Sequence, residues 1–292
     1  MQKKQIELSI IIVNFGNTKN YTKKCLDSLK NAVKKINTEI IVVDNISRDG
    51  TLEMIKKDYP KVIYIRKEEA HGFGANNNFG IKVAIGRYVL FLNNDTEIID
   101  KNIFSEMIEW MDKNPQVAVS SSALLNADKK TIQASGGSFP NLFRVIAWMT
   151  FLNNSYHHNL SYYNKAHNQD WVTGAFYMVR KEVLNKVGNF DEDYDAYVEE
   201  VDLSYRIKKS GFDIWYLPNW KIVHYGGISY GSEKALIYEM KNLKLFYKKH
   251  YPKWQLPVLN IIIKFGCLLR IIIFSLINPK LSKIYAKAIK II

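Results

Sequence analysis

The sequence predicts an α/β protein built on a mostly parallel sheet with helices on both faces. Over about the first 122 residues, short apolar runs alternate with segments whose apolar residues recur at helical spacing. The run Tyr88–Leu92 is too short for a helix and is typical of a strand buried on both faces. Asn93, Asn94 and Asp95 follow it directly. Because open α/β sheets bind ligands at the carboxyl ends of strands, this stretch predicts a binding site, with a plain Asx-rich turn as the alternative.

Each element of the alternation has its own local signal. Continuous apolar runs predict the strands, which are Leu8–Asn14, Thr38–Val43, Val62–Ile65, Tyr88–Leu92 and Val117–Ser120. Helical spacing predicts the helices, which are Asn20 to about Ile36, Thr51–Tyr59, Gly74–Ile85 and Ile103–Met111. Strands that alternate with helices in this way form parallel sheets.

The pattern changes after about residue 122. Residues 126–168 are polar, aromatic and irregular, which is typical of long loops that carry binding residues or lids. Regular structure is expected again from Trp171 to Val179. Pro252 and Pro257 then indicate a junction before the C-terminal segment.

The positive charge is concentrated at the C-terminus. The chain carries a net charge of +13, and the segment from Glu233 onward contributes +10 of it, with 12 Lys and Arg against 2 Glu. An anionic partner is therefore expected there: a lipid surface, nucleic acid or a phosphorylated glycan carrier. The basic residues stand among aliphatic ones and not in a nucleic-acid-binding module, which argues against nucleic acid.

The cysteines and the N-terminus bear on the compartment. Cys25 and Cys267 make no disulfide framework and indicate a reducing environment. The short apolar run Leu8–Val13 has no small-residue cleavage site after it, so no signal peptide is expected.

Polar or aromatic side chains follow three of the predicted strands. They are Asn14 and Phe15, Asp44 and Asn45, and Asn93 to Asp95. In a doubly wound sheet these ends converge. An aromatic ring can stack on a nucleobase, a carboxylate can accept from a ring N–H, and the third group can hold Mg2+ or Mn2+ on a diphosphate. Asn76, Asn77 and Asn78, near the start of a helix, either donate to phosphate or sugar oxygens or cap the helix.

Several stretches in a fixed order carry a resemblance to a known family. They are Ser9–Phe15, Ile41–Thr51, Gly72–Gly80, Gly86–Thr96, Thr173–Ala175 and Tyr197–Arg206, followed by Gly211 and Val223–Gly227. On these stretches the chain resembles family 2 glycosyltransferases of the GT-A fold, above all the branch with rhamnosyltransferases of bacterial surface glycans. The resemblance implies a catalytic domain at 1–232, with a nucleotide-binding part at about 1–122 and an acceptor part at about 123–232. Residues 233–292 are expected to form a basic, amphipathic helical appendage.

The resemblance implies a nucleotide site beside a metal site. The implied nucleotide contacts are Asn14, Phe15, Asp44, Asn76, Asn78 and Asn94. Among them, Asp44 matches the carboxylate that reads the base. Asp95 matches the last residue of the metal-binding Asp-x-Asp element, whose first position is Asn93 here, and His224 matches a histidine that approaches the metal in some relatives. Because an amide oxygen coordinates more weakly than a carboxylate, the metal is expected to bind mainly with the donor diphosphate.

The resemblance also implies a catalytic acidic pair. Glu199 and Glu200 stand where the family has this pair, and the second member, Glu200, is expected to act as the base, with Glu in place of the usual Asp. The acceptor contacts are expected at Trp171, Gly174 and Asp202. From the residues alone, Trp171 is equally well a core tryptophan, and the acidic residues can form a solvated face paired with Arg206 and Lys208.

Taken together, these residues predict an inverting glycosyltransferase for cell-surface polysaccharide synthesis. Its donor is expected to be a UDP- or dTDP-linked sugar, its cofactor Mg2+ or Mn2+, and its acceptor a glycan or a lipid-linked saccharide. Two alternatives remain: a nucleotidyltransferase on a similar sheet, and a basic nucleic-acid-binding protein. The acidic pair followed by His224 argues against the first.

The C-terminal segment has the pattern of amphipathic helices. Val258–Ile277 is mostly aliphatic, but Lys264 and Arg270 interrupt it, and each costs about 2.5 to 3.5 kcal/mol near a bilayer centre. Beyond Pro279, Lys280, Lys283, Lys287 and Lys290 oppose the stripe of Leu281, Ile284, Ala288 and Ile291. This pattern predicts a helix lying in an anionic membrane interface, with the enzyme peripheral on the cytoplasmic face of the cell membrane. Packing on the catalytic domain or on a second subunit is the alternative.

Overall fold

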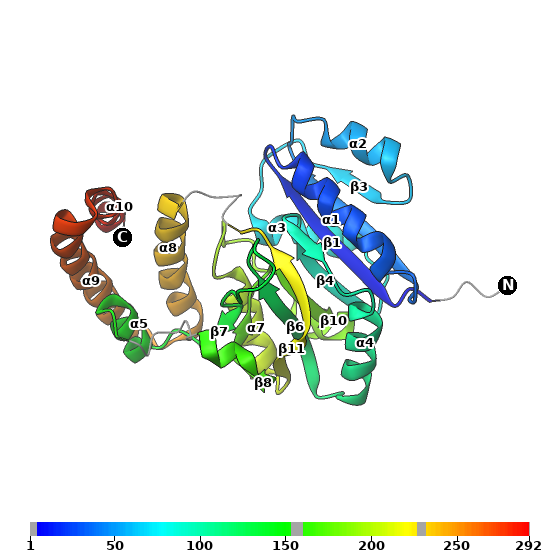
Figure 1. The fold of residues 1–292 in the computed structure, drawn as a ribbon. Helices are drawn as coiled ribbons and strands as arrows, with labels where there is room; N and C mark the ends of the chain where they lie inside the picture. The colour runs from blue at the N-terminus through cyan, green and yellow to red at the C-terminus, as the bar shows by residue number, and fades with distance from the viewer. Residues whose placement is uncertain (1–4, 153–159, 227–231, 292) are drawn as a thin grey trace.

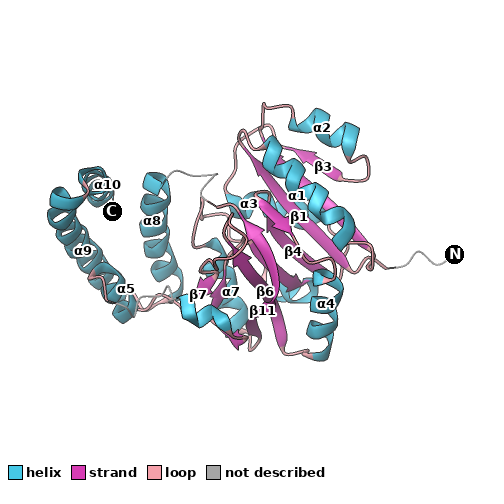
Figure 2. Ribbon diagram, in the orientation of Figure 1, coloured by secondary structure: helices cyan, strands magenta, loops and turns pink. Residues whose placement is uncertain are grey.

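The computed structural model describes residues 5–152, 160–226 and 232–291, and shows a central sheet flanked by helices with a helical layer at one end (Figures 1 and 2). Within these residues nine strands form the sheet, in the order β3-β2-β1-β4-β10-β6-β11-β5, with β8 paired to β11. The strands are β1 Leu8–Phe15, β2 Thr38–Asn45, β3 Ile63–Arg66, β4 Tyr88–Asn93, β5 Thr96–Ile98, β6 Val117–Leu125, β8 His167–Asn168, β10 Phe176–Arg180 and β11 Asp213–His224. A separate pair consists of β7 Gly136–Gly137 and β9 Trp171–Val172.

Most neighbouring long strands of the sheet are parallel, as the sequence predicts. β1 pairs in parallel with β2 and β4, β2 with β3, and β6 with β11. β10 lies between β4 and β6 and is antiparallel to both, and β5 is antiparallel to β11. The predicted α/β class is confirmed, with antiparallel strands that the alternation of strand and helix does not reveal.

Helices cover both faces of the sheet. They are α1 Lys19–Ala32, α2 Thr51–Asp58, α3 Phe73–Val83, α4 Ile103–Lys113, α6 Lys181–Val187 and α7 Glu199–Lys209. Alternate residues of β1 separate two hydrophobic cores, since side chains of a strand point to opposite faces. Ile10 and Ile12 pack with α1, α2 and α4, whereas Ile11 packs with α3, α6 and α7.

The segment predicted to be irregular contains two short helices. They are α5 Leu142–Met149 and a 3-10 helix over Leu160–Asn164. The side chain of Asn141 caps α5 by accepting a hydrogen bond from the backbone N–H of Arg144, at 2.9 Å. The sequence did not predict α5, because its eight residues lie within a longer segment of polar and aromatic residues.

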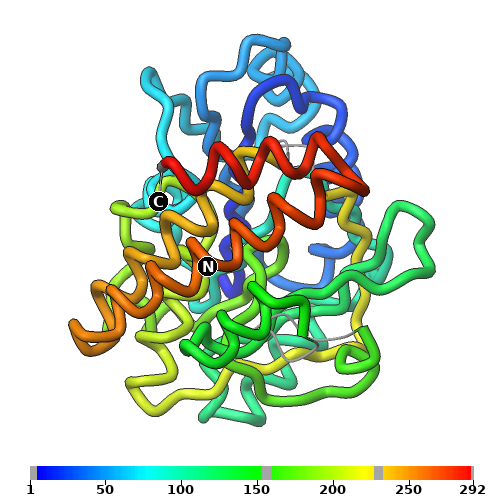
Figure 3. The backbone as a smooth tube through the Cα atoms, turned by 90° about the vertical axis from the view of Figure 1, so that its left-hand side faces the viewer, coloured from blue at the N-terminus to red at the C-terminus, as the bar shows by residue number. Residues whose placement is uncertain are grey.

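The C-terminal helices confirm the predicted helical appendage. α8 Ser232–His250, α9 Gln255–Ile277 and α10 Pro279–Ile291 pack with α5 around a third hydrophobic core, and we call these four helices the helical layer. Figure 3 shows α8, α9 and α10 running across one side of the molecule. A Cβ at Gly266 of α9 would lie 2.5 Å from the Cβ of Met149, so the glycine allows α5 to approach closely. Buried Arg270 donates to the backbone carbonyls of Trp148 and Met149 at the end of α5.

The aliphatic stripe of α10 faces inward, which corrects the prediction that it lies in a membrane. Ile284 and Ala288 are buried, and Leu281 is partly buried, in the core with α8 and α9. The side chain of Ile291 lies outside the described residues. Lys280, Lys283, Lys287 and Lys290 are exposed, as predicted. The exposed apolar surface is instead on α9, whose 23 residues are long and apolar enough to cross a membrane.

Candidate active site

The three predicted strand ends meet at one edge of the sheet. Asn14 on β1 is in register with Asp44 on β2, and Val13 is in register with Asn93 on β4. The polar residues at the ends of β1, β2 and β4 are therefore neighbours, as a parallel sheet requires.

A buried hydrogen-bond network ties these strand ends to α1. The side-chain oxygen of Asn14 accepts from Thr22 at 2.5 Å and from Thr18 at 3.0 Å. The Asn94 amide donates to the same oxygen at 3.2 Å and to both threonine hydroxyls. Asn14 and Asn94 are both buried. This corrects their expected role: they form the scaffold of the site, and their side chains do not face a ligand.

Asp44 is the centre of a second set of hydrogen bonds. Its carboxylate accepts from Asn14 at 2.9 Å, from the Tyr64 hydroxyl at 2.6 Å and from the Arg66 guanidinium at 3.2 Å. The Asp44 side chain is fully buried, whereas that of Arg66 is 44% exposed. Half-buried Phe15 is in register with Asn45 beside it. A nucleobase therefore reaches Asp44 only by replacing a partner, and Arg66 is the most accessible one.

The asparagines of α3 bind backbone groups, which corrects the prediction that they contact phosphate or sugar. The Asn76 amide donates to the carbonyls of His71 and Gly72, both at 2.9 Å. The Asn78 amide donates to the carbonyl of Phe190 at 2.9 Å, and its oxygen accepts from the N–H of the same residue. Both side chains are buried. Asn76 joins α3 to the segment before it, and Asn78 joins α3 to the loop after α6. The alternative prediction, capping of the helix, is not seen either, since the N-cap residue Gly72 carries no side-chain cap hydrogen bond.

The predicted metal ligands come together at the ends of β4 and β11. His224 Nε2 lies 3.3 Å from Asp95 Oδ1 and 3.4 Å from the side-chain nitrogen of Asn93. Sequence reasoning missed Gln133, whose Oε1 lies 2.9 Å from His224 Nδ1 and whose Nε2 donates to the His224 carbonyl at 2.6 Å. Because an amide oxygen only accepts, Gln133 places the imidazole proton on Nδ1, and the lone pair of Nε2, which the Asn93 amide approaches, is the one that a metal would use.

A divalent cation fits this donor set. A carboxylate oxygen, an imidazole nitrogen and an amide are ordinary ligands for Mn2+ and, through oxygen, for Mg2+. Across the described ranges no three His, Cys, Asp or Glu side chains group as a metal cluster.

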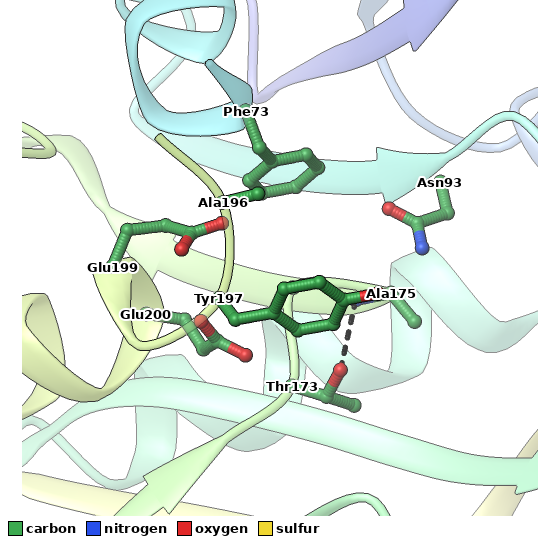
Figure 4. A pocket seen from close by; sticks show the side chains of 9 residues that line it. Phe73, Asn93, Thr173, Ala175, Ala196, Tyr197, Glu199 and Glu200 are labelled. Atoms are coloured by element: carbon green, nitrogen blue, oxygen red, sulfur yellow. Dashed lines mark hydrogen bonds between the residues drawn. The ribbon is translucent and has the colours of Figure 1, made fainter. Parts of the chain in front are cut away.

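The acidic pair opens into a cavity beside this group (Figure 4). The cavity has a volume of about 150 Å³. The residues that line it include Phe73, Asn93, Thr173, Gly174, Tyr197, Glu199 and Glu200. It joins the end of β4 to the start of α7, so the predicted metal side and the predicted base share one space.

A strained turn aims the pair. Tyr197 and Val198 both adopt left-handed backbone conformations, with φ of 65° and 74°, and α7 starts at the next residue. Such conformations cost about 1 to 3 kcal/mol each and recur at functional sites, and for a β-branched residue they are rare. The turn places Glu199 and Glu200 in the first turn of α7, where the helix dipole favours negative charge.

The two carboxylates have different environments. Glu199 is 4% exposed, whereas Glu200 is more open to the cavity. Burial raises the pKa of Glu199 well above its ordinary value of 4.5, and the neighbouring charge of Glu200 raises it further. Burial and the neighbouring carboxylate therefore both favour the protonated form of Glu199.

We expect Glu199→Gln to stabilise the protein relative to wild type, increasingly as the pH rises above 4.5. Between the unfolded pKa and the raised folded pKa, only the folded state keeps the proton on Glu199, so unfolding releases it and wild-type stability falls with rising pH. Melting temperatures of both proteins from acidic to slightly alkaline pH measure the difference. The exposed Glu109→Gln is the control, and a pH-independent difference for Glu199→Gln would contradict the assignment.

Of the three predicted acceptor residues, one lines the cavity and two do not. Gly174 lines the cavity, where a Cβ would lie 2.9 Å from the Phe73 ring. Trp171 is buried in the core, and its indole N–H donates to the Ser138 carbonyl at 3.1 Å. Asp202 is buried and binds His250 of α8 at 2.5 Å and Arg206 at 2.8 Å. We correct the latter two assignments: Trp171 is a core residue, and Asp202 fastens α8 to α7.

The site combines a carboxylate pair with side chains that can bind a metal ion, at the carboxyl ends of the strands, where nucleotides bind in such sheets. Enzymes that transfer groups from nucleotide-activated donors have sites of this kind. The chain belongs to glycosyl transferase family 2, whose family model matches residues 9–188. The predicted family and the predicted sugar-transferring activity are thereby confirmed.

Known proteins that are similar to this chain include glycosyltransferases, in agreement with the family assignment. Rhamnosyltransferase WbbL of Escherichia coli (strain K12) is 31% identical over 226 residues, which cover 74% of this chain and 82% of that protein. N-acetylglucosaminyl-diphospho-decaprenol L-rhamnosyltransferase of Mycobacterium tuberculosis is 33% identical over 91 residues, 30% of each chain. Among solved structures, mannosyltransferase PcManGT from Pyrobaculum calidifontis, in complex with GDP-Man and Mn2+, has a TM-score of 0.58 at 16% identity over 98% of this chain and 74% of that one. That likeness confirms the GT-A fold.

Proposed function

We propose that this glycosyltransferase inverts the anomeric carbon of a nucleotide-diphospho-sugar and that Glu200 is its general base. The observation that carries the proposal is the shared cavity of Glu200, Glu199 and Asn93 (Figure 4). An acceptor hydroxyl there gives its proton to the Glu200 carboxylate while its oxygen bonds to C1 of the sugar. The bond from C1 to the diphosphate breaks in the same displacement, and the diphosphate leaves with the electron pair.

The remaining residues bind and orient the donor. Asp95, His224 and Asn93 are the proposed ligands of Mg2+ or Mn2+, which neutralises charge on the departing diphosphate when bound. Phe15 and Asp44 are the proposed contacts of the base, with Arg66 as the group that moves aside. Burial beside Glu200 raises the pKa of Glu199, which disfavours a second negative charge in the cavity.

The proposed acceptor is a lipid-linked or surface glycan intermediate. This extends to the present chain what the name of the Mycobacterium tuberculosis rhamnosyltransferase says of that protein, namely that its acceptor is a saccharide on a diphospho-decaprenol carrier. The test is a panel of UDP-, dTDP- and GDP-sugars incubated with Mn2+, with released nucleotide as the readout. Release from one donor, raised by a polyprenyl-diphosphate saccharide, is expected. No release from any donor, with and without acceptor, would contradict the proposal.

We also propose that the helical layer holds the enzyme at an anionic membrane surface in the cytoplasm. The outward side of α9 is apolar at steps of three and four residues: Val258, Ile261, Phe265, Leu268, Ile272 and Leu276 are all exposed. Phe143 and Ile146 of α5, the helix packed beside α9, are exposed too. α10, which packs on α9, carries four exposed lysines, and each contributes about 1 kcal/mol near anionic lipid. Apolar surface rimmed by cations is the chemistry of an interfacial helix.

The membrane proposal predicts that the full chain floats with vesicles containing phosphatidylserine at physiological salt. Replacing Ile261, Leu268 and Ile272 together by serine is expected to weaken flotation strongly, because it interrupts the apolar face with polar side chains and leaves the α9 core contacts in place. Ile85→Ser is the matched control, since Ile85 is as exposed as these residues but lies on the catalytic domain. Undiminished flotation by the triple variant, or none by the wild type, would contradict the proposal. A wild-type dimer that dissociates in the triple variant would assign the face to a second copy.

A further inference from the structure

We infer that Asn242 of α8 is a positioning residue for the acidic pair, because it holds the strained turn from which Glu199 and Glu200 project. The inference rests on the proposed function, which assigns proton transfer to that pair. Asn242 lies beyond residues 9–188, which match the family model, and beyond the catalytic domain expected from the sequence.

The hydrogen bonds of Asn242 define the turn. Its side-chain amide donates to the Ala196 carbonyl at 2.7 Å and to the Tyr197 carbonyl at 3.0 Å. These carbonyls belong to the peptide groups on either side of Tyr197. One amide nitrogen with two N–H donors therefore fixes both peptide planes, and with them the left-handed conformation of Tyr197.

The burial of Asn242 makes the restraint strong. The side chain of Asn242 is fully buried, and its amide oxygen has no hydrogen-bond partner. Burying an unpaired oxygen costs free energy of folding, and the two hydrogen bonds from the amide N–H groups offset that cost. It does not line the cavity of the acidic pair. Asn242 therefore acts on the chemistry only through the turn.

The rest of α8 braces the same region. Lys241 binds the Asp195 carboxylate at 2.7 Å, and the Asp195 carbonyl accepts from the N–H of Phe73 at 3.2 Å. At the other end of α8, His250 binds Asp202, one turn into α7. Burial alone would raise the pKa of Asp202, but the bonds from His250 and Arg206 outweigh it and hold that pKa below its ordinary value. α8 thus forms hydrogen bonds both to the turn before Glu199 and to α7, which follows the turn.

The test is Asn242→Ala in the full chain. Without the two hydrogen bonds the turn relaxes, and kcat is expected to fall by about tenfold to a hundredfold, the scale of a misplacement near 1 Å. Binding of the donor with Mn2+ is expected to stay close to wild type, because Asp44 and Asp95 are on other elements. The acidic limb of the kcat–pH profile is expected to shift, since the spacing and burial of the two carboxylates change.

Two further variants separate positioning from folding. Leu243→Ala removes a buried side chain from the same helix but none of the hydrogen bonds to the turn, and it should lower the melting temperature while leaving kcat and its pH profile unchanged. Asn242→Leu keeps the shape of the side chain and removes its donors, and it should reproduce the kcat loss with a melting temperature near wild type. Wild-type kcat and pH profile in both Asn242 variants, or an equal kcat loss in Leu243→Ala, would overturn the inference. Normal turnover by Glu200→Gln would instead overturn the proposed function.

Discussion

Glu200→Gln is expected to lower kcat by about a hundredfold or more, the usual contribution of a general base, while donor binding stays intact. Glutamine keeps the shape of the side chain but cannot accept the acceptor's proton. Because the lost interaction belongs to the transition state, kcat and kcat/KM should fall together. Steady-state kinetics with the donor found in the nucleotide-sugar panel measures this, and calorimetric titration of the donor verifies binding.

Glu199→Gln is the matched control for this prediction. Glutamine resembles the neutral carboxyl that burial favours at Glu199, so most of the turnover should remain. The reverse result, an inactive Glu199→Gln with an active Glu200→Gln, would move the base by one residue. Full activity of both variants would remove the acidic pair from the mechanism.

Asp95→Ala is expected to abolish the dependence of donor binding on Mn2+. Asp95 is the charged ligand of the proposed set, and His224 and Asn93 alone supply no negative charge. Asn93→Ala should weaken binding less, because an amide contributes no charge. Gln133→Ala removes only the group that orients His224, and a loss of metal affinity of about 10- to 100-fold is typical of such a change.

Calorimetric titration of the nucleotide with and without Mn2+ gives each of these values. The expected order of loss is Asp95→Ala, then Gln133→Ala and Asn93→Ala. Metal-independent turnover by the wild type would contradict the metal assignment itself. Unchanged Mn2+ dependence in Asp95→Ala would move the site elsewhere along the sheet edge.

The sequence predicts the strand ends of the site because buried strands are continuous apolar runs and the residues that stop them stand out. β1, β2 and β4 follow this rule, and a parallel sheet brings their ends together without further information. The acidic pair and His224 came from the family resemblance, which fixes an order of motifs. The structure then places the acidic pair in one cavity with Asn93, and His224 beside Asp95 and Asn93.

The roles of the asparagines and of Asp202 depend on partners far away in the chain. Asn78 binds Phe190, 112 positions on, and Asp202 binds His250, 48 positions on. A sequence shows a polar side chain near a strand end or a helix start, but not whether its partner is a ligand or another part of the protein. The same limit applies to α10: its spacing shows an apolar stripe, and only the fold shows that α8 and α9 cover it.

The hydrogen bonds from α8 to the active-site turn and to α7 limit where the chain can be joined to a related protein in a chimera. A chimera designed to change only the proposed membrane-binding surface would exchange the C-terminal helices. If the crossover falls near residue 188 or 232, it also replaces Asn242 and His250, and with them the fit between α8 and the host's own turn. A crossover after His250 leaves that fit intact, so we expect such an exchange to change the proposed membrane-binding surface without altering turnover.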